Sequence, residues 1–105
     1  MKNIEAKDFN AFIQSDFCVV QFSATWCGPC KALTNVFNSL SSDITDVPFG
    51  KVDIDDCQEI SQKFGIRSVP TVICFQRGVE VERSLGLKGR NVYEDLISKA
   101  RTKNV

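Results

Sequence analysis

The segment FCVVQFSATWCGPC, residues 17–30, joins a run of apolar residues to a Cys-x-x-Cys motif. Residues 17–22 are nearly all apolar, which is typical of a central strand buried on both faces. From about Cys30 to Ser41 the apolar residues recur at helical spacing and form one stripe. The sequence therefore predicts that the motif lies where a buried strand passes into a helix.

The rest of the chain alternates between strand and helix patterns. The spacing predicts helices over residues 8–15, 58–64 and 91–101, the last with Val92, Leu96, Ile97 and Ala100 on its inner face. Strands are predicted over 47–54, 71–75 and 79–85, with a turn at 77–78 that pairs the last two as a hairpin. This order indicates an α/β fold with a central mixed sheet, mostly five-stranded, flanked on both faces by about four helices.

Length and composition limit the class of protein. The 105 residues are predicted to form a single domain, residues 1–105, and 43% hydrophobic residues are enough for a core without disulfide staples. Lys+Arg and Asp+Glu both number 13, and no basic tract stands out, so a nucleic-acid surface is not expected. No signal-peptide-like or membrane-spanning apolar run is found, so we expect a cytoplasmic protein away from membranes, with the nucleus not distinguished.

The cysteines point to redox chemistry. There are five of them and no histidine, which excludes Ser-His and Cys-His catalysis and mixed Cys/His zinc sites. At a helix N-terminus, free backbone N–H groups and the helix dipole stabilise a thiolate, so Cys27 is expected to attack a disulfide and Cys30 to resolve the mixed disulfide. Gly28 and Pro29 shape the small ring and add no charge, which favours a reductant.

The alternative for the motif is a zinc half-site or a pair of buried structural cysteines. Zinc needs two further ligands, and the remaining Cys18, Cys57 and Cys74 show no second paired spacing. We therefore expect no metal. Cys18 and Cys74 are interpreted as core residues, and Cys57 as a partly buried, inert thiol whose thiolate is disfavoured by neighbouring acids.

Several segments together resemble the thioredoxin family, in its eukaryotic form: FSATWCGPCK at 22–31, VDIDDC at 52–57, FGIRSVPT at 64–71, and glycines at 78 and 86. The resemblance implies a thioredoxin fold and a protein-disulfide reductase. It also implies a cis peptide bond before Pro70, facing the cysteines, with Val69 free to pair with an extended substrate. Trp26 then covers one side of the site with Asp55 as its indole partner, and Gly86 leaves room for the substrate chain; an ordinary bulge glycine is the alternative for Gly86.

The resemblance has further implications for partners. It implies no bound cofactor, with electrons supplied from NADPH through a separate flavoprotein, thioredoxin reductase. Disulfide-containing proteins are the expected substrates, and the chain is expected to be a monomer. Two other functions are considered: a non-catalytic thioredoxin-fold binding subunit or chaperone-like module, and a disulfide oxidase or isomerase. Retention of the full motif disfavours the first, and the absence of histidine from the motif disfavours the second.

The sequence departs from the family pattern behind the cysteines. Gln21 stands where the family usually has a buried Asp that exchanges a proton with the second cysteine, and Gln cannot titrate. Lys51, on the next predicted strand, could face Gln21 and is expected either to reach solvent or to pair with Asp53. Asn35 replaces a helix-kinking proline, so the active-site helix is expected to keep its hydrogen bond there.

Overall fold

A mixed sheet of five strands forms the centre of the computed structural model, which describes all 105 residues. The strands lie in the order β1-β3-β2-β4-β5. β1 and β2 both pair parallel with β3, whereas β4 pairs antiparallel with β2 and with β5. The strand bounds are β1 Lys2–Asn3, β2 Cys18–Ser23, β3 Phe49–Asp53, β4 Thr71–Gln76 and β5 Val79–Leu85. The predicted fold class is confirmed.

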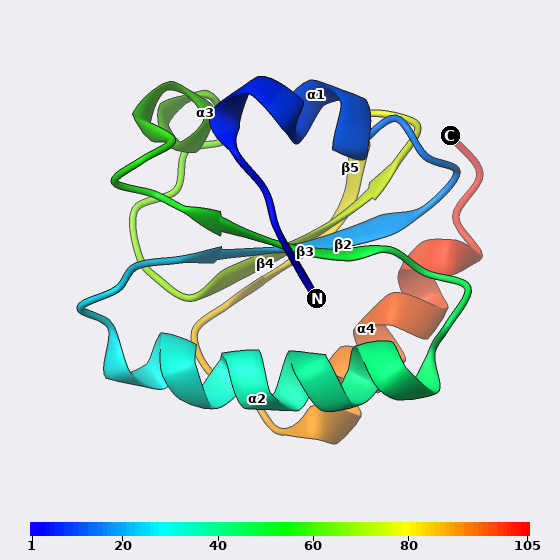
Figure 1. Cartoon of the computed structure of the whole chain (residues 1–105). Helices are drawn as coiled ribbons and strands as arrows, with labels where there is room; N and C mark the ends of the chain where they lie inside the picture. Colours follow the sequence, from blue (N-terminus) through cyan, green and yellow to red (C-terminus); the bar gives the residue numbers. More distant parts are fainter.

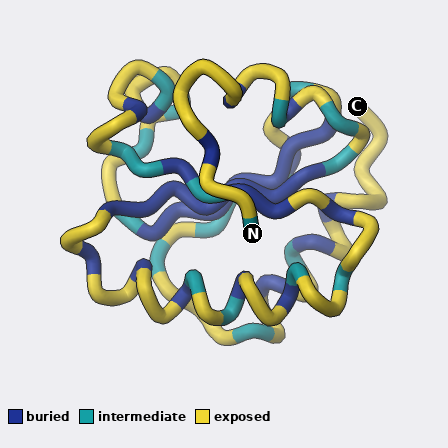
Figure 2. Tube along the Cα trace, in the orientation of Figure 1, coloured by how far each residue is buried: buried dark blue, intermediate teal, exposed yellow.

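Helices cover both faces of this sheet, with α1 and α3 on one side and α2 and α4 on the other (Figure 1). Their bounds are α1 Phe9–Phe12, preceded by a 3₁₀ turn at Ala6–Asp8, α2 Gly28–Asp43, α3 Gln58–Lys63 and α4 Arg90–Arg101. The two layers of side chains form two separate apolar clusters, and the central strands are the most deeply buried segments (Figure 2). None of the helices is both long and apolar enough to cross a membrane.

The helix that carries the Cys-x-x-Cys motif, α2, follows the buried strand β2, as the sequence predicts. Cys27 is its N-cap residue, and Pro29 stands in the first turn, where a missing N–H costs no intrahelical bond. Leu33, Phe37 and Leu40 form the buried stripe that packs on the sheet. The helix runs without interruption past Asn35 to Asp43 (Figure 1), so it keeps the hydrogen bond that a proline would remove.

Three elements differ from the sequence prediction. β1 has only two residues, both exposed, and so has no periodicity to reveal it. The helix expected over residues 8–15 is one short turn, Phe9–Phe12, after the 3₁₀ segment. On the predicted inner face of α4, Ile97 and Ala100 are buried and Leu96 packs against the same cluster, but Val92 is wrong, since it is 40% exposed. Tyr93 is buried in its place, because positions i, i+4 and i+7 share one helix face with Ile97 and Ala100.

Candidate functional site

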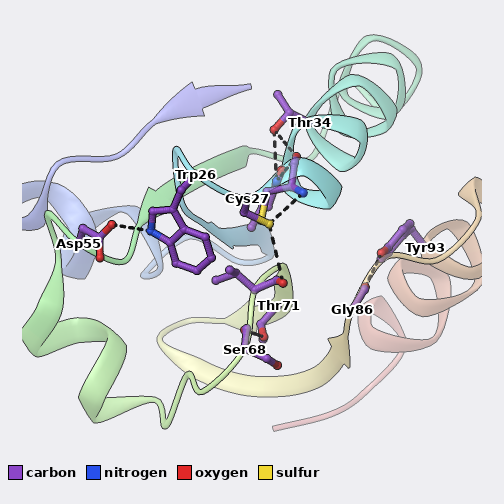
Figure 3. The surroundings of a disulfide bond; sticks show 11 residues. Trp26, Cys27, Thr34, Asp55, Ser68, Thr71, Gly86 and Tyr93 are labelled. Carbon is purple, nitrogen blue, oxygen red and sulfur yellow. Dashed lines mark hydrogen bonds between the residues drawn. A yellow bond between two sulfur atoms is a disulfide. The ribbon is translucent and has the colours of Figure 1, made fainter.

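The two motif cysteines are joined in a disulfide at the N-terminus of α2. Their Cα atoms are 5.3 Å apart, and the backbone N–H of Cys30 donates to Cys27 Sγ at 3.2 Å (Figure 3). Cys27 retains 5% of its surface exposed and Cys30 only 1%. After reduction, the same N–H lies in place to stabilise a Cys27 thiolate. The geometry fits a pair whose first sulfur meets the substrate while the second is protected behind it.

The loop before β4 faces the disulfide. The Val69–Pro70 peptide bond is cis, as predicted, and Pro70 is buried. The carbonyl oxygen of Val69 lies 3.9 Å from Cys27 Sγ (Figure 3). Proline has no N–H, so the chain presents no donor to the sulfurs at that position. The cysteine pair and this loop, 42 residues apart in sequence, thus form the centre of the site.

Trp26 lies on the surface beside the pair. It is 68% exposed, and its indole Nε1–H donates to Asp55 Oδ2 at 3.0 Å, as predicted (Figure 3). The loop that carries Asp55 is itself fixed, because Asp53 Oδ1 accepts the backbone N–H groups of Asp55 at 2.8 Å and Asp56 at 3.3 Å. A large, exposed aromatic ring held by a hydrogen bond is typical of a contact surface.

Gly86 follows the end of β5 and lies next to the cis-proline loop. Its N–H donates to Pro70 O at 2.9 Å, and its φ of +79° is a conformation that glycine adopts without steric cost. A Cβ built at this position would meet no atom within 4 Å, so the space beside it is open. The alternative for Gly86 is an ordinary bulge glycine. The irregularity in the β4–β5 pairing lies at Cys74 and Phe75, away from Gly86, so Gly86 is not part of a bulge there.

Gln21 lies behind the disulfide and is completely buried. Its Nε2 donates to Cys30 O at 3.1 Å and to Thr34 Oγ1 at 3.2 Å, while the Thr34 hydroxyl donates to the same carbonyl at 2.9 Å. Gln21 Oε1 has no hydrogen-bond partner. The sequence did not reveal the contribution of Thr34, although its position four residues after Cys30 on a helix places the two residues on one face.

Lys51 lies opposite Gln21 in the β2–β3 register, as expected. Of the two alternatives for its charge, pairing with Asp53 is not observed, because the Asp53 carboxylate accepts N–H groups from its own loop. Lys51 is half-buried and borders a cavity of about 230 Å³ that also contacts Thr25, Lys31 and Thr34. Its charge is therefore reached by solvent, which was the other expectation.

The other three cysteines are buried and form no disulfide. Burial raises the pKa of Cys18 to about 11 and that of Cys74 to about 12. Burial also raises the pKa of Cys57, with a further contribution from the negative charges of Asp56 and Asp53. Cys57 is more deeply buried than expected, with 3% of its surface exposed. Nowhere in the structure do three or more His, Cys, Asp or Glu side chains form a group that could hold a metal ion.

One further side chain touches the site and was not singled out from the sequence. The Tyr93 hydroxyl of α4 donates to Gly86 O at 3.1 Å (Figure 3). It also accepts the backbone N–H of Lys88 at 2.9 Å. No motif marks this tyrosine, because an aromatic residue on the inner stripe of a helix has the pattern of an ordinary core residue.

Comparison with known proteins gives a consistent result. The family model described as Thioredoxin matches residues 1–100. A thioredoxin from Chlamydia caviae is 42% identical over 98 residues, covering 93% of this chain and 96% of the relative. A thioredoxin from Equus caballus is 40% identical over 90 residues, covering 82% of this chain and 86% of the relative. Among solved structures, a Plasmodium falciparum thioredoxin superposes with a TM-score of 0.87 at 32% identity, covering 94% of this chain and 98% of that one.

Proposed function

This chain belongs to the thioredoxin family and is a thiol-disulfide oxidoreductase that reduces protein disulfides, and we propose that Cys27 and Cys30 perform the exchange. The observation that carries the assignment is the joined pair at the N-terminus of α2, facing the cis-proline loop. A folded binding module has no need of a closed two-cysteine ring at that position, so the non-catalytic alternative is not favoured.

The reaction follows from the different surroundings of the two sulfurs. The Cys27 thiolate attacks one sulfur of the substrate disulfide, which forms a mixed disulfide and releases the other substrate sulfur as a thiolate that takes up a proton. Cys30 then loses its proton and attacks Cys27 Sγ, which releases the second substrate thiolate. Two electrons pass to the substrate, and the Cys27–Cys30 disulfide of this structure is the oxidised product.

The substrate chain is proposed to lie across the surface formed by Trp26, Val69, Pro70 and Gly86. The exposed indole supplies apolar contact, and the Val69 backbone beside Cys27 Sγ can pair with an extended segment. The open space beside Gly86 accommodates the passing chain. Gly28 and Pro29 shape the ring of the disulfide, and Asp55 holds the indole in place.

Proton transfer at Cys30 is proposed to be altered in this protein, but not lost. Gln21 holds the Cys30 carbonyl, and its amide cannot take up or release a proton. The proton of Cys30 then leaves without help from a buried acid at position 21. Lys51 is proposed to act only as a solvated charge at the edge of the site, since it forms no ion pair that would fix it toward Cys30.

The wider setting is proposed from family membership. Residues 1–105 are taken to work as one domain and as a monomer in the cytoplasm, with no bound cofactor. Disulfide-containing proteins are the substrates, and a separate thioredoxin reductase returns electrons from NADPH. The support for this proposal is the match of the family model over residues 1–100, together with the exposed Trp26 ring beside the disulfide.

The assignment is tested by insulin reduction with dithiothreitol as the electron source, followed by turbidity. The parent chain and a Cys57→Ala control are expected to reduce insulin, because Cys57 is buried, is not part of the disulfide and has a pKa raised by burial. Cys27→Ser is expected to be inactive, and a Cys27→Ser variant as active as the parent contradicts the assignment. A redox titration against glutathione gives the direction of the reaction: a potential near that of the oxidising foldases argues against a reductase.

A further inference from the structure

In the turn after β5, two backbone groups share one side-chain atom as their hydrogen-bond partner. The N–H of Gly86 bonds to Pro70 O, but the carbonyl of Gly86 and the N–H of Lys88 both bond to the hydroxyl of Tyr93. The hydroxyl donates to the first and accepts from the second, so its single proton and a lone pair are both used. Figure 3 shows the Tyr93 ring directed at Gly86 from α4.

Tyr93 is itself held rigidly. It is completely buried, and its ring packs edge-on against Phe37 of α2, with centroids 5.2 Å apart and planes at 89°. Burial raises the pKa of Tyr93, so the hydroxyl keeps the proton that it donates to Gly86 O throughout the neutral range. The ring thus links the turn to the same helix that carries Cys27 and Cys30 at its N-terminus.

We propose that Tyr93 is a positioning residue for protein substrates: its hydroxyl holds the Gly86–Lys88 turn in the shape that keeps the space beside Gly86 open. The inference rests on the proposed role of Gly86 in accommodating the substrate chain. Without the hydroxyl, Gly86 O and Lys88 N–H lose their side-chain partner within the protein. The turn, with exposed Leu87 between them, is then free to take other shapes. The cysteine pair remains as it is, because it makes no contact with this hydroxyl.

The proposal separates large substrates from small ones. A protein disulfide has to fit its chain between the cis-proline loop and the turn, whereas a small disulfide needs to reach only Cys27 Sγ. Loss of the Tyr93 hydroxyl therefore weakens the binding of protein substrates and leaves the exchange step unchanged.

The test is Tyr93→Phe, which removes the hydroxyl and keeps the ring against Phe37. Reduced protein is mixed with excess insulin, and the single-turnover rate is followed against insulin concentration. The half-saturating insulin concentration is expected to rise about five- to tenfold, while the limiting rate stays unchanged. This factor corresponds to the free energy that the two lost hydrogen bonds of the turn contribute. The rate with the small disulfide dithiobis(nitrobenzoate) and the equilibrium with glutathione are expected to stay within about twofold.

A matched control is Ser61→Ala, which removes another buried hydroxyl bonded to a backbone carbonyl, on α3 and away from the turn. It is expected to bind insulin like the parent. An unchanged half-saturating concentration in Tyr93→Phe overturns the proposal, and so does an equal loss with the small disulfide, which indicates damage to the cysteine pair or to the whole fold. A parent chain that does not reduce insulin contradicts the proposed function itself.

Amide hydrogen exchange of the unaltered protein gives a second test that does not depend on any variant. The Lys88 N–H, bonded to a buried hydroxyl, is expected to exchange much more slowly than an open turn amide. Fast exchange at Lys88 in the parent chain overturns the proposal, because the turn is then not held by Tyr93.

Discussion

Replacing Gln21 with leucine is expected to stabilise the oxidised protein, although Gln21 makes two hydrogen bonds. The orientation of its amide is fixed, because Cys30 O can only accept and therefore has to face Nε2. Oε1 is then left buried without a donor. The oxidised pair cannot supply one, since neither sulfur of a disulfide carries a proton. Leucine removes this unpartnered oxygen and occupies nearly the same volume.

The magnitude follows from three contributions. Removing a buried unpartnered acceptor gains about 1–3 kcal/mol, and losing the two bonds from Nε2 costs about 0.5–1.5 kcal/mol each, so the two nearly cancel. No new unpartnered atom appears, because the Thr34 hydroxyl still donates to Cys30 O at 2.9 Å. Burial of the apolar leucine side chain contributes about 1.5–3 kcal/mol, offset by up to about 1.5 kcal/mol for imperfect shape. The net change is a gain of about 1 kcal/mol in the free energy of unfolding, which raises the Tm by roughly 4–8 °C for a domain of this size.

Urea denaturation of the oxidised parent and Gln21→Leu, followed by far-ultraviolet circular dichroism, measures this change. The measurement is made under oxidising conditions throughout, so that the disulfide constrains both unfolded chains equally. A Leu33→Ala variant on the same apolar layer gives the scale of an ordinary core defect, with an expected loss of about 2–5 kcal/mol. A loss of about 1 kcal/mol or more in Gln21→Leu equals the contribution of a buried hydrogen bond. That result means that Oε1 has a partner in solution, and it refutes the reasoning.

Gln21→Asp tests the same position for proton transfer. A carboxylate in this fully buried place has its pKa raised by desolvation. The folded state then favours the protonated form, so stability is greatest below the unfolded pKa of about 4 and is lost as the pH rises through the raised value. The resolving step at Cys30 is expected to be faster near neutral pH than in the parent, and an unchanged pH–rate profile contradicts the proposed role of Gln21.

Three further predictions concern the rest of the site. Gly86→Ala is expected to cost about 1–2 kcal/mol of unfolding free energy in urea denaturation, because the left-handed backbone and not a steric clash requires glycine; a neutral result contradicts this. In the reduced protein at pH 8, iodoacetamide is expected to label Cys27 first and to leave Cys18 and Cys74 unlabelled, as their raised pKa values and burial predict; mass spectrometry of the labelled peptides decides. Asp55→Ala is expected to change the Trp26 fluorescence and to leave the free energy of unfolding within about 1 kcal/mol, since the lost bond is exposed; a larger loss of stability means that the pair has a structural role.

Much of the fold and the centre of the site could be predicted because the signals are local. The strand-to-helix junction is visible in the apolar run before the motif, and α2 is visible in the stripe of Leu33, Phe37 and Leu40. The cis bond at Pro70 and the Trp26–Asp55 hydrogen bond came from family resemblance, and both are confirmed. These features need only a short segment or a specific motif to be recognised.

The features that could not be predicted depend on contacts between distant segments. β1 is a strand only because its two residues lie beside β3, and nothing in Lys2–Asn3 alone favours that pairing. For Lys51 the sequence leaves two alternatives open, contact with solvent or an ion pair with Asp53. The structure decides between them because the Asp53 carboxylate accepts a hydrogen bond from its own loop. Tyr93 has the sequence pattern of a core residue, and its hydroxyl becomes informative only when α4 is placed against the turn at Gly86.

The three loops around the disulfide share one structural principle, which explains how this site can accept varied protein chains. Each loop has a side chain that bonds to the backbone: Asp53 accepts N–H groups in the loop of Asp55, Thr71 Oγ1 donates to Ser68 O at 2.8 Å before the cis proline, and Tyr93 bonds to the turn after β5. A surface that is ordered before binding loses little conformational entropy when a partner docks. Recognition can therefore rest on backbone pairing and apolar contact beside Cys27, which many disulfide-containing chains can offer, while the exchange step takes place at the cysteine pair.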